Sequence, residues 1–344
     1  MKGATRLVLI LVAIVTEAFL DDSVTQSAEQ NKNQTPAVRR KRGLRWVFTG
    51  SNGIRAGWGI VLFPAIAVLV VLGIGKLLHH LLGPTPRNPS LLTLPFVSYF
   101  LLAEFLGLLV ALAVMARIER RSILSFGLQG SARFARFAGG LVCGFAAVSV
   151  VVFTLVKMHA LTLDAPSPAD HEVWGHAFFW AAAFLLVGLC EESALRGYLQ
   201  YALSRGIGFW WGALLLSALF GGVHGINPGE TPVGLFSAAA IGLVFCLSLW
   251  YTGSLFWAIG FHAAWDWGES YFYGTFDSGT LVDTRLFTAH PVGNALISGG
   301  NTGPEGSLLV FPLIAVMVLA MWLWWGRRAP PAFSGGAWRA PLQR

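Results

Sequence analysis

Long apolar stretches recur along the chain and restrict its folding more than any other feature. Several of them approach the roughly 20 residues that an α-helix needs to cross a hydrocarbon core of about 30 Å. No alternating pattern of about ten residues suggests membrane-spanning strands, so helices are expected to do the spanning. The 344 residues are 55% hydrophobic and only 12% charged, a balance typical of membrane proteins. The sequence therefore predicts an all-α, polytopic membrane protein.

We expect about eight transmembrane helices around a polar intramembrane cavity. Their predicted ranges are 58–78, 92–116, 137–156, 173–203, 208–225, 232–250, 254–268 and 307–326. The corresponding organisation is an N-terminal apolar segment and basic arm (1–50), two helices (51–136), a transmembrane core (137–268), an extracytoplasmic loop (269–306), and a last helix with a cytoplasmic tail (307–344). No internal repeat is evident, which gives no support to a transporter made of two inverted halves.

Charged residues divide between the two predicted sides of the membrane. One side receives the basic groups from Arg39 to Arg55, from Arg117 to Arg136, Arg205, and Arg327 with Arg328, whereas the loops on the other side are mainly acidic. Because basic loops stay in the cytoplasm, both termini are predicted to be cytoplasmic, and we expect a bacterial inner membrane. The net charge of +7 is therefore assigned to membrane orientation and not to nucleic-acid binding.

The first 20 residues have the outline of a signal peptide. An apolar run follows Lys2 and Arg6, but it contains Glu17 and lacks a clear small-x-small cleavage site. A cleaved signal would export the basic arm that follows, against the charge rule. We therefore favour an uncleaved start and a flexible arm.

Two adjacent carboxylates and an arginine lie deep in the fourth apolar stretch, which reads Glu191-Glu192-Ser-Ala-Leu-Arg196. Charged side chains at such depth cost about 3 kcal/mol each on insertion scales and usually mark a functional site. Neighbouring residues on a helix point about 100° apart. Glu192 lies four residues before Arg196, the spacing of an ion pair on one helix. This pattern predicts a supporting Glu192–Arg196 pair and leaves Glu191 free to face another helix.

Two histidines and an aspartate occur at comparable depth in neighbouring predicted helices. His224 lies at the end of the fifth helix, and His262 and Asp266 share one face of the seventh. At about 1.5 Å per residue, Glu191, His224, His262 and Asp266 lie roughly 18, 25, 12 and 18 Å from the cytoplasmic ends of their helices. One cavity is therefore expected to hold all four side chains.

A carboxylate and two imidazoles around a cavity in an apolar matrix suit the activation of water. Glu191 is the candidate general base, and one histidine would polarise the water. The other histidine, with Asp266, would stabilise the oxyanion formed from a peptide carbonyl. The same residues, Glu191, His224, His262 and Asp266, are also candidate ligands of a divalent metal such as zinc, which lowers the pKa of bound water to about 7. The residues alone leave both mechanisms open.

The motifs that carry this chemistry are Glu191-Glu192-xxx-Arg196, Phe220-xxx-His224 and His262-xxx-Asp266. In order and spacing they resemble those of the CAAX-protease and bacteriocin-processing family of intramembrane proteases, the type II CAAX prenyl endopeptidase-like proteins. The resemblance covers about 173–268. It implies an eight-helix fold whose cavity opens towards the cytoplasm, and endoproteolysis by a glutamate-activated water, with metal dependence left open. It also implies that Glu191 and His224 activate water, that His262 and position 266 form the oxyanion site, and that Glu192 and Arg196 brace the helix.

Asp266 departs from the eukaryotic CAAX proteases, which resemble one another in having Asn at this position. A carboxylate donates a hydrogen bond to an oxyanion only when it is protonated. The departure favours metal binding or a bacterial-type substrate over a prenylated protein. The expected partners are membrane lipid and a hydrophobic peptide or protein substrate, lipid-modified or transmembrane.

Other protease classes and cysteine-based sites would require their own sequence motifs. The sequence contains neither a zinc-protease His-Glu-x-x-His motif nor a Gly-x-Ser-x-Gly elbow. Cys143, Cys190 and Cys246 lack the spacing of a disulfide framework or a thiolate metal site. The main alternative is a non-catalytic membrane scaffold of the same fold that binds or escorts a client protein. Such a scaffold would keep Glu192 for packing but would not need Glu191.

Overall fold

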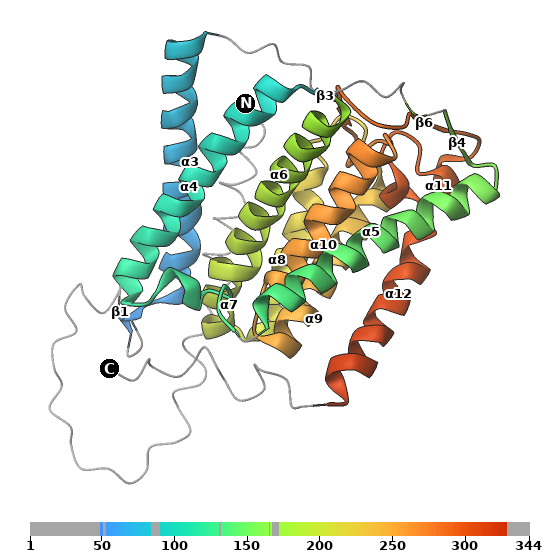
Figure 1. Ribbon diagram of the computed structural model, residues 1–344. Coiled ribbons are helices and arrows are strands. Elements are labelled where there is room, and N and C mark those ends of the chain that lie inside the picture. The colour runs from blue at the N-terminus through green and yellow to red at the C-terminus, as the bar shows by residue number, and fades with distance from the viewer. Residues whose placement is uncertain are drawn as a thin grey trace, which may run out of the picture.

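Helices make up most of the chain that the structure describes. The computed structural model describes residues 49–50, 53–83, 90–130, 132–164, 166 and 172–328. The N-terminal apolar segment, the basic arm as far as residue 48 and the tail after residue 328 lie outside these ranges. In the described part, tilted helices lie beside one another and run between two ends of the molecule (Figure 1).

All eight apolar segments singled out from the sequence form helices. These are α3 (Ala56–Leu82), α4 (Leu94–Glu119), α5 (Arg133–Lys157), α6 (Val173–Glu192) with its continuation α7 (Gln200–Gly206), α8 (Phe209–His224), α9 (Pro232–Thr252), α10 (Phe256–Asp266) and α12 (Val310–Met321). Their ends differ from the predicted ends by a few residues, because an apolar run does not mark where a helix is capped.

Five helices in the described part of the chain are long and apolar enough to cross a membrane. They are Ala56–Leu82, Leu94–Glu119, Arg133–Lys157, Val173–Gly206 and Pro232–Thr252, and Phe209–His224 and Val310–Gly326 are shorter apolar helices. The chain is thus a helical membrane protein. Eight crossings and the cytoplasmic position of the termini stay predictions.

Helix α9 shows how local sequence sets the helix ends. The Thr231 side chain accepts a hydrogen bond from the backbone N–H of Gly234 at 3.3 Å, and Pro232 occupies the first turn. A capping hydroxyl and an early proline both suit a helix start, where backbone N–H groups lack partners. The helix ends at Gly253, whose φ of 68° is readily adopted by glycine.

Two helices widen into π-helical turns directly after the sequence motifs. Helix α6 passes into η2 (Ser193–Leu199) after Glu192, and α10 passes into η3 (Trp267–Phe272) after Asp266. Such wide turns are rare and occur frequently at functional sites. Apolar sequence patterns did not predict them.

The largest apolar core holds η2 in place. Phe63 of α3, Met115 of α4 and Tyr198 of η2 are buried members of this core. The Tyr198 ring stacks on Phe63 with centroids 4.8 Å apart and meets Phe126 edge-on at 5.1 Å. The wide turn that carries Arg196 is therefore packed on aromatic rings from other parts of the chain.

Helices α5 and α10 approach closely through glycine. A Cβ atom at Gly140 would lie 2.9 Å from the backbone nitrogen of Phe261, and one at Gly144 would lie 2.9 Å from the Phe261 carbonyl carbon. On the facing helix, a Cβ at Gly260 would lie 3.0 Å from the backbone nitrogen of Leu141. Because any side chain would separate the two backbones, these glycines determine where α10 lies.

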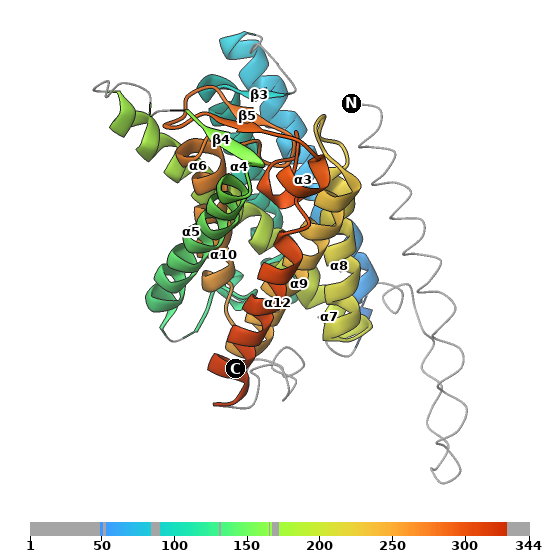
Figure 2. The same ribbon diagram turned by 90° about the vertical axis from the view of Figure 1, so that its right-hand side faces the viewer.

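The segment between α10 and α12 folds over one end of the helices (Figures 1 and 2). Its strand β5 (Leu281–Val282) pairs in parallel with β3 (Leu91–Leu92), and β6 (Ala289–Pro291) pairs antiparallel with β4 (Leu161–Leu163). The segment also contains the short helices α11 (Ala295–Ser298) and η4 (Pro304–Gly306). Strand pairs thus tie this loop to the connections before α4 and after α5.

Candidate active site

The four candidate site residues line one cavity of about 210 Å³. Glu191 comes from α6, His224 from the end of α8, and His262 and Asp266 from α10. Apolar side chains, among them Phe184, Val187 and Ile241, line the same cavity. Three helices that are far apart in sequence therefore bring the three motifs together.

His262 lies among three carboxylates. Its Nε2 atom is 3.4 Å from Oδ2 of Asp266 and 3.8 Å from Oε2 of Glu191. Its Nδ1 atom is 3.1 Å from Oε1 of Glu192. Both ring nitrogens therefore face carboxylates, an arrangement that suits the imidazolium form, in which both nitrogens carry a proton. The surroundings of His262 thus suit a positive charge facing the cavity.

His224 has one fixed ring nitrogen and one that remains free for chemistry. Its Nδ1 lies 2.7 Å from the backbone carbonyl oxygen of Phe220, one helical turn earlier. A carbonyl oxygen only accepts hydrogen bonds, so Nδ1 carries a proton, and in the neutral ring Nε2 holds the lone pair. The Phe220 ring also meets the imidazole edge-on, with centroids 4.6 Å apart. His224 is therefore oriented as a hydrogen-bond acceptor at the cavity.

Glu192 and Arg196 form the ion pair that their spacing predicted. Nη1 of Arg196 lies 2.9 Å from Oε1 of Glu192, and both side chains are fully buried. The guanidinium also lies over the Phe220 ring at 4.4 Å and over the Phe245 ring at 5.6 Å. These contacts with α8 and α9 help to stabilise the buried guanidinium charge, whose burial would otherwise be costly.

Sequence reasoning missed the contact between Glu192 and His262. The spacing of Glu192 and Arg196 predicts a pair within one helix, whereas the same oxygen of Glu192 also contacts His262 on α10. Helical spacing reports only neighbours on one helix, and these residues are 70 positions apart. Glu192 therefore positions a site residue as well as pairing with Arg196.

The loop after α10 contributes to the cavity wall, which the sequence did not indicate. Asp277, Ser278, Thr280 and Glu305 all line the cavity. Burial, followed by the negative charge of Asp277, raises the pKa of Glu305 to about 8. Burial also raises the pKa of Asp277. The cavity therefore reaches the end of the helices that this loop covers, and its opening towards the cytoplasm stays a prediction.

The four candidate residues do not form a compact ligand set for a metal ion. Among the described residues, the three ligand atoms that lie within 4.8 Å of one another belong to a different group, formed by residues of the loop and η3. In addition, both nitrogens of His262 already face carboxylates. Metal binding by Glu191, His224, His262 and Asp266 stays a prediction, as does activation of water without a metal.

A comparison with known protein families identifies the same segment of the chain. Residues 173–268 match the family model described as type II CAAX prenyl endopeptidase Rce1-like. This segment is similar to the Rce1-like family. The match begins at the first residue of α6 and ends two residues after Asp266, so it contains all three motifs. The comparison confirms the family resemblance found in the sequence.

The Rce1-like match covers only part of the chain. Helices α3, α4 and α5, the 269–306 loop and α12 lie outside the matched residues. Comparisons with curated proteins and with solved structures gave no match. The loop that contributes to the cavity wall therefore lies outside the Rce1-like match.

Proposed function

We propose that this protein is an intramembrane endopeptidase that hydrolyses a peptide bond with a water molecule activated by Glu191 and His224. The observation that carries the proposal is the convergence of Glu191, His224 and His262 on one cavity, together with the Rce1-like match over the same residues. A cavity with a carboxylate, a neutral imidazole and a cationic imidazole contains the groups that hydrolysis requires.

Glu191 is suited to act as the general base. Its side chain is 31% exposed, whereas Glu192 is fully buried and held by Arg196. Oε2 of Glu191 is buried without a hydrogen-bond partner among the described residues, so the carboxylate, which lines the cavity, keeps an uncommitted acceptor for a proton from water. The lone pair on Nε2 of His224 would orient the same water molecule. The proton taken by Glu191 would pass to the amide nitrogen as the C–N bond breaks.

His262 is suited to stabilise the oxyanion. The water oxygen adds to the carbonyl carbon and places a negative charge on the carbonyl oxygen. An imidazolium held at Nδ1 by Glu192 provides a positive charge, and its Nε2–H, 3.4 Å from Asp266, is the group that would turn to that oxygen. Asp266 then acts on His262 and need not donate a hydrogen bond itself. This role removes the difficulty that a carboxylate at position 266 poses for direct oxyanion binding.

The substrate class follows from the cavity wall. Phe184, Ile241, Leu313 and Met317 are apolar residues of that wall, and the site lies within helices that are apolar enough for a membrane. Such a wall would accept a hydrophobic peptide segment or a lipid-modified peptide. Polar peptides would lose hydration on entering without gaining partners.

The proposal is tested by cleavage of a peptide library that includes prenylated peptides. The purified protein in detergent is compared with Glu191→Gln and with Glu172→Gln, an exposed glutamate at the start of α6. We expect cleavage by the wild type and the Glu172 variant, and loss of cleavage in the Glu191 variant, with or without a chelator. Cleavage by Glu191→Gln at the wild-type rate would refute the mechanism. Absence of cleavage by a folded wild type would favour a membrane scaffold.

A further inference from the structure

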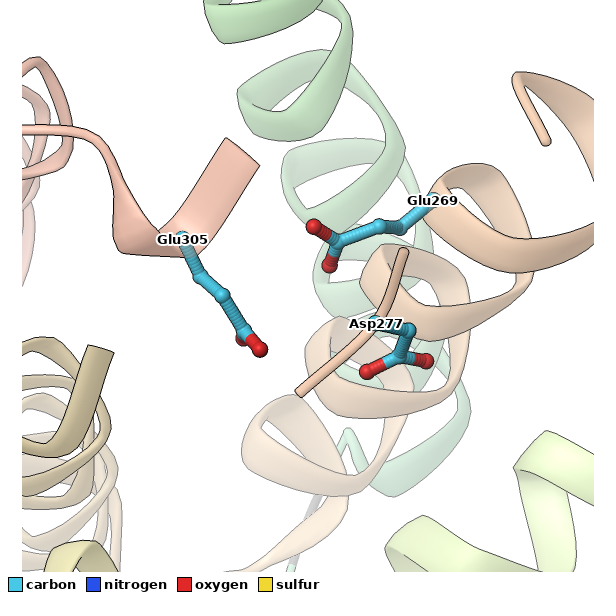
Figure 3. Close-up of side chains that lie close together, drawn as sticks. All are labelled: Glu269, Asp277 and Glu305. Carbon is cyan, nitrogen blue, oxygen red and sulfur yellow. The ribbon is translucent and has the colours of Figure 1, made fainter. Parts of the chain in front are cut away.

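A second group of carboxylates lies beside the proposed active site and outside the Rce1-like match. It consists of Glu269 in η3, Asp277 in the following turn and Glu305 in η4, and one oxygen of each lies within 4.8 Å of the others. Figure 3 shows the Glu269 carboxylate extending towards the space between Glu305 and Asp277. None of these residues belongs to the catalytic mechanism proposed above.

Glu269 is fully buried, with the Trp265 side chain as a neighbouring donor. Its exposed fraction is 0%, and neither side-chain oxygen has a hydrogen-bond partner of acceptable geometry among the described residues. Gly303 brings backbone close to it, since a Cβ there would lie 2.9 Å from Oε1 of Glu269. Moving a carboxylate from water into the protein interior without a partner costs several kcal/mol of folding free energy. Its position is therefore explained best by a ligand that the carboxylate binds.

The other two carboxylates have neutral partners that leave their charge uncompensated. Oδ2 of Asp277 accepts a hydrogen bond from the Ser270 hydroxyl at 2.7 Å. Oε1 of Glu305 accepts bonds from the backbone N–H and the hydroxyl of Ser278 at 2.5 and 2.6 Å. Among ion pairs of the described residues, none joins this cluster to a lysine, arginine or histidine. Within the described residues, the three acids therefore converge without a cationic side chain in direct contact, and His262 and His224 act on Asp277 only from a greater distance.

We propose that Glu269, Asp277 and Glu305 bind one divalent cation, and that this cation is Ca²⁺. Carboxylate oxygens without nitrogen or sulfur ligands suit hard cations. Ca²⁺ holds oxygens at about 2.3–2.6 Å, so ligands on opposite sides of the ion lie about 4.6–5.2 Å apart. The three oxygens lie within 4.8 Å of one another, which the coordination sphere of one such ion can span. Mg²⁺ is bound at about 2.0–2.1 Å in a rigid octahedron that usually keeps several waters, so a site built from three protein carboxylates suits the more flexible Ca²⁺ sphere better.

Bound Ca²⁺ would join three separate segments at the covered end of the helices. Glu269 continues from α10, which carries His262 and Asp266, while Asp277 and Glu305 also line the cavity. Backbone bonds already connect these segments, since Gly279 N–H donates to Thr302 at 3.1 Å and Thr275 N–H donates to Glu269 at 3.0 Å. The cation would replace the repulsion between three acids with attraction and would hold the loop over the cavity.

The experiment measures cation binding by the full-length protein in detergent after removal of metal with a chelator. Ca²⁺ is titrated by calorimetry, and Tb³⁺ is used as a luminescent substitute excited through tryptophan. Glu269→Gln and Asp277→Asn remove ligand charges. Asp283→Asn removes an exposed acid of the same loop and is the matched control. Glu191→Gln tests whether the ion sits in the proposed active site instead.

We expect one Ca²⁺ per chain and a Tm that rises with the logarithm of Ca²⁺ concentration. Glu269→Gln and Asp277→Asn should each weaken binding at least tenfold, while Asp283→Asn and Glu191→Gln should bind like the wild type. In chelator, Glu269→Gln should be at least as stable as the wild type, because it removes a buried unpaired charge.

Three results would overturn the Ca²⁺ proposal. These are no saturable binding by the wild type, unchanged binding after Glu269→Gln, or loss of binding in Glu191→Gln with retention in Glu269→Gln. The wild-type titration decides the question even if one variant fails to fold. Because binding is measured without a peptide, the result is independent of whether the protein proves to be a protease.

Discussion

Glu192 on α6 holds His262 on α10, with 3.1 Å between Oε1 of Glu192 and Nδ1 of the imidazole. The same oxygen lies 2.9 Å from Nη1 of Arg196. One buried carboxylate thus connects an ion pair within a helix to a residue of the proposed active site. This relationship makes Glu192 a positioning residue and gives it a testable kinetic effect.

Glu192→Gln should lower kcat with little change in KM. The amide keeps the shape of the carboxylate but removes the charge that supports a cationic His262. Changes of this kind beside a functional histidine typically cost about 10–100-fold. Measuring kcat, KM and the pH profile on the best library peptide checks the prediction. A purely structural role would lower the amount of folded enzyme but leave the pH profile of the folded fraction unchanged.

Glu192→Ala should destabilise the fold far more than Glu192→Gln. Alanine leaves the fully buried Arg196 without its ionic partner, and breaking a buried pair in this way costs about 3–5 kcal/mol. Thermal unfolding in detergent measures the difference. Equal stability of the alanine and glutamine variants would mean that Phe220 and Phe245 alone compensate the guanidinium charge.

Glu191→Gln should abolish cleavage without lowering stability. General-base catalysis contributes about 10²–10⁴-fold, so kcat should fall by at least that factor. The buried Oε2 atom of Glu191 has no hydrogen-bond partner among the described residues, and His262 keeps Glu192 and Asp266 as acidic neighbours when Glu191 is replaced. We therefore expect an unchanged or higher Tm, as is common when an active-site group is removed. A large drop in Tm would indicate that Glu191 is structural.

The apolar segments and the motifs could be predicted from sequence because both depend on local patterns. Hydropathy located all eight helices, since each apolar run must be buried in lipid or protein. Spacing of four residues correctly paired Glu192 with Arg196 and placed His262 beside Asp266. The family resemblance was carried by the same local motifs, and the family model matches over the same range.

The rest of the site depends on contacts between distant segments. Asp277 and Glu305 were interpreted only as charges of an outer loop, because nothing in their neighbouring residues shows that the loop folds back over the cavity. The contact between Glu192 and His262 likewise depends on how α6 and α10 pack against each other along their lengths. Glycines are only a partial signal of such contacts: a Cβ at Gly221 would meet Ala239 of α9 at 3.0 Å, whereas a Cβ at Gly222 would meet nothing within 4 Å.

Asp266→Asn should retain cleavage within about tenfold of the wild type, whereas Asp266→Ala should lose more. Oδ2 of Asp266 lies 3.4 Å from Nε2 of His262, and the asparagine carbonyl oxygen can still present an acceptor to that nitrogen. Alanine removes the acceptor and leaves the imidazole without a partner at Nε2. A metal-ligand role predicts a different result, namely severe loss in both variants and sensitivity to chelator. Kinetics of the two variants with and without chelator separate these mechanisms.

Gly144→Ala should destabilise the protein and impair cleavage through a shift of α10. An added Cβ would lie 2.9 Å from the carbonyl carbon of Phe261, the residue before His262, and overpacking of this kind costs about 1–3 kcal/mol. Gly139→Ala on the same helix is the matched control, because the nearest atom to its Cβ is a Trp257 ring carbon at 4.0 Å. Alanine is a better helix former than glycine by about 1 kcal/mol, so the control should be equally or more stable. Thermal unfolding and cleavage rates of both variants measure the effect. Equal behaviour of the two alanine variants would show that the contact between α5 and α10 does not fix the position of His262.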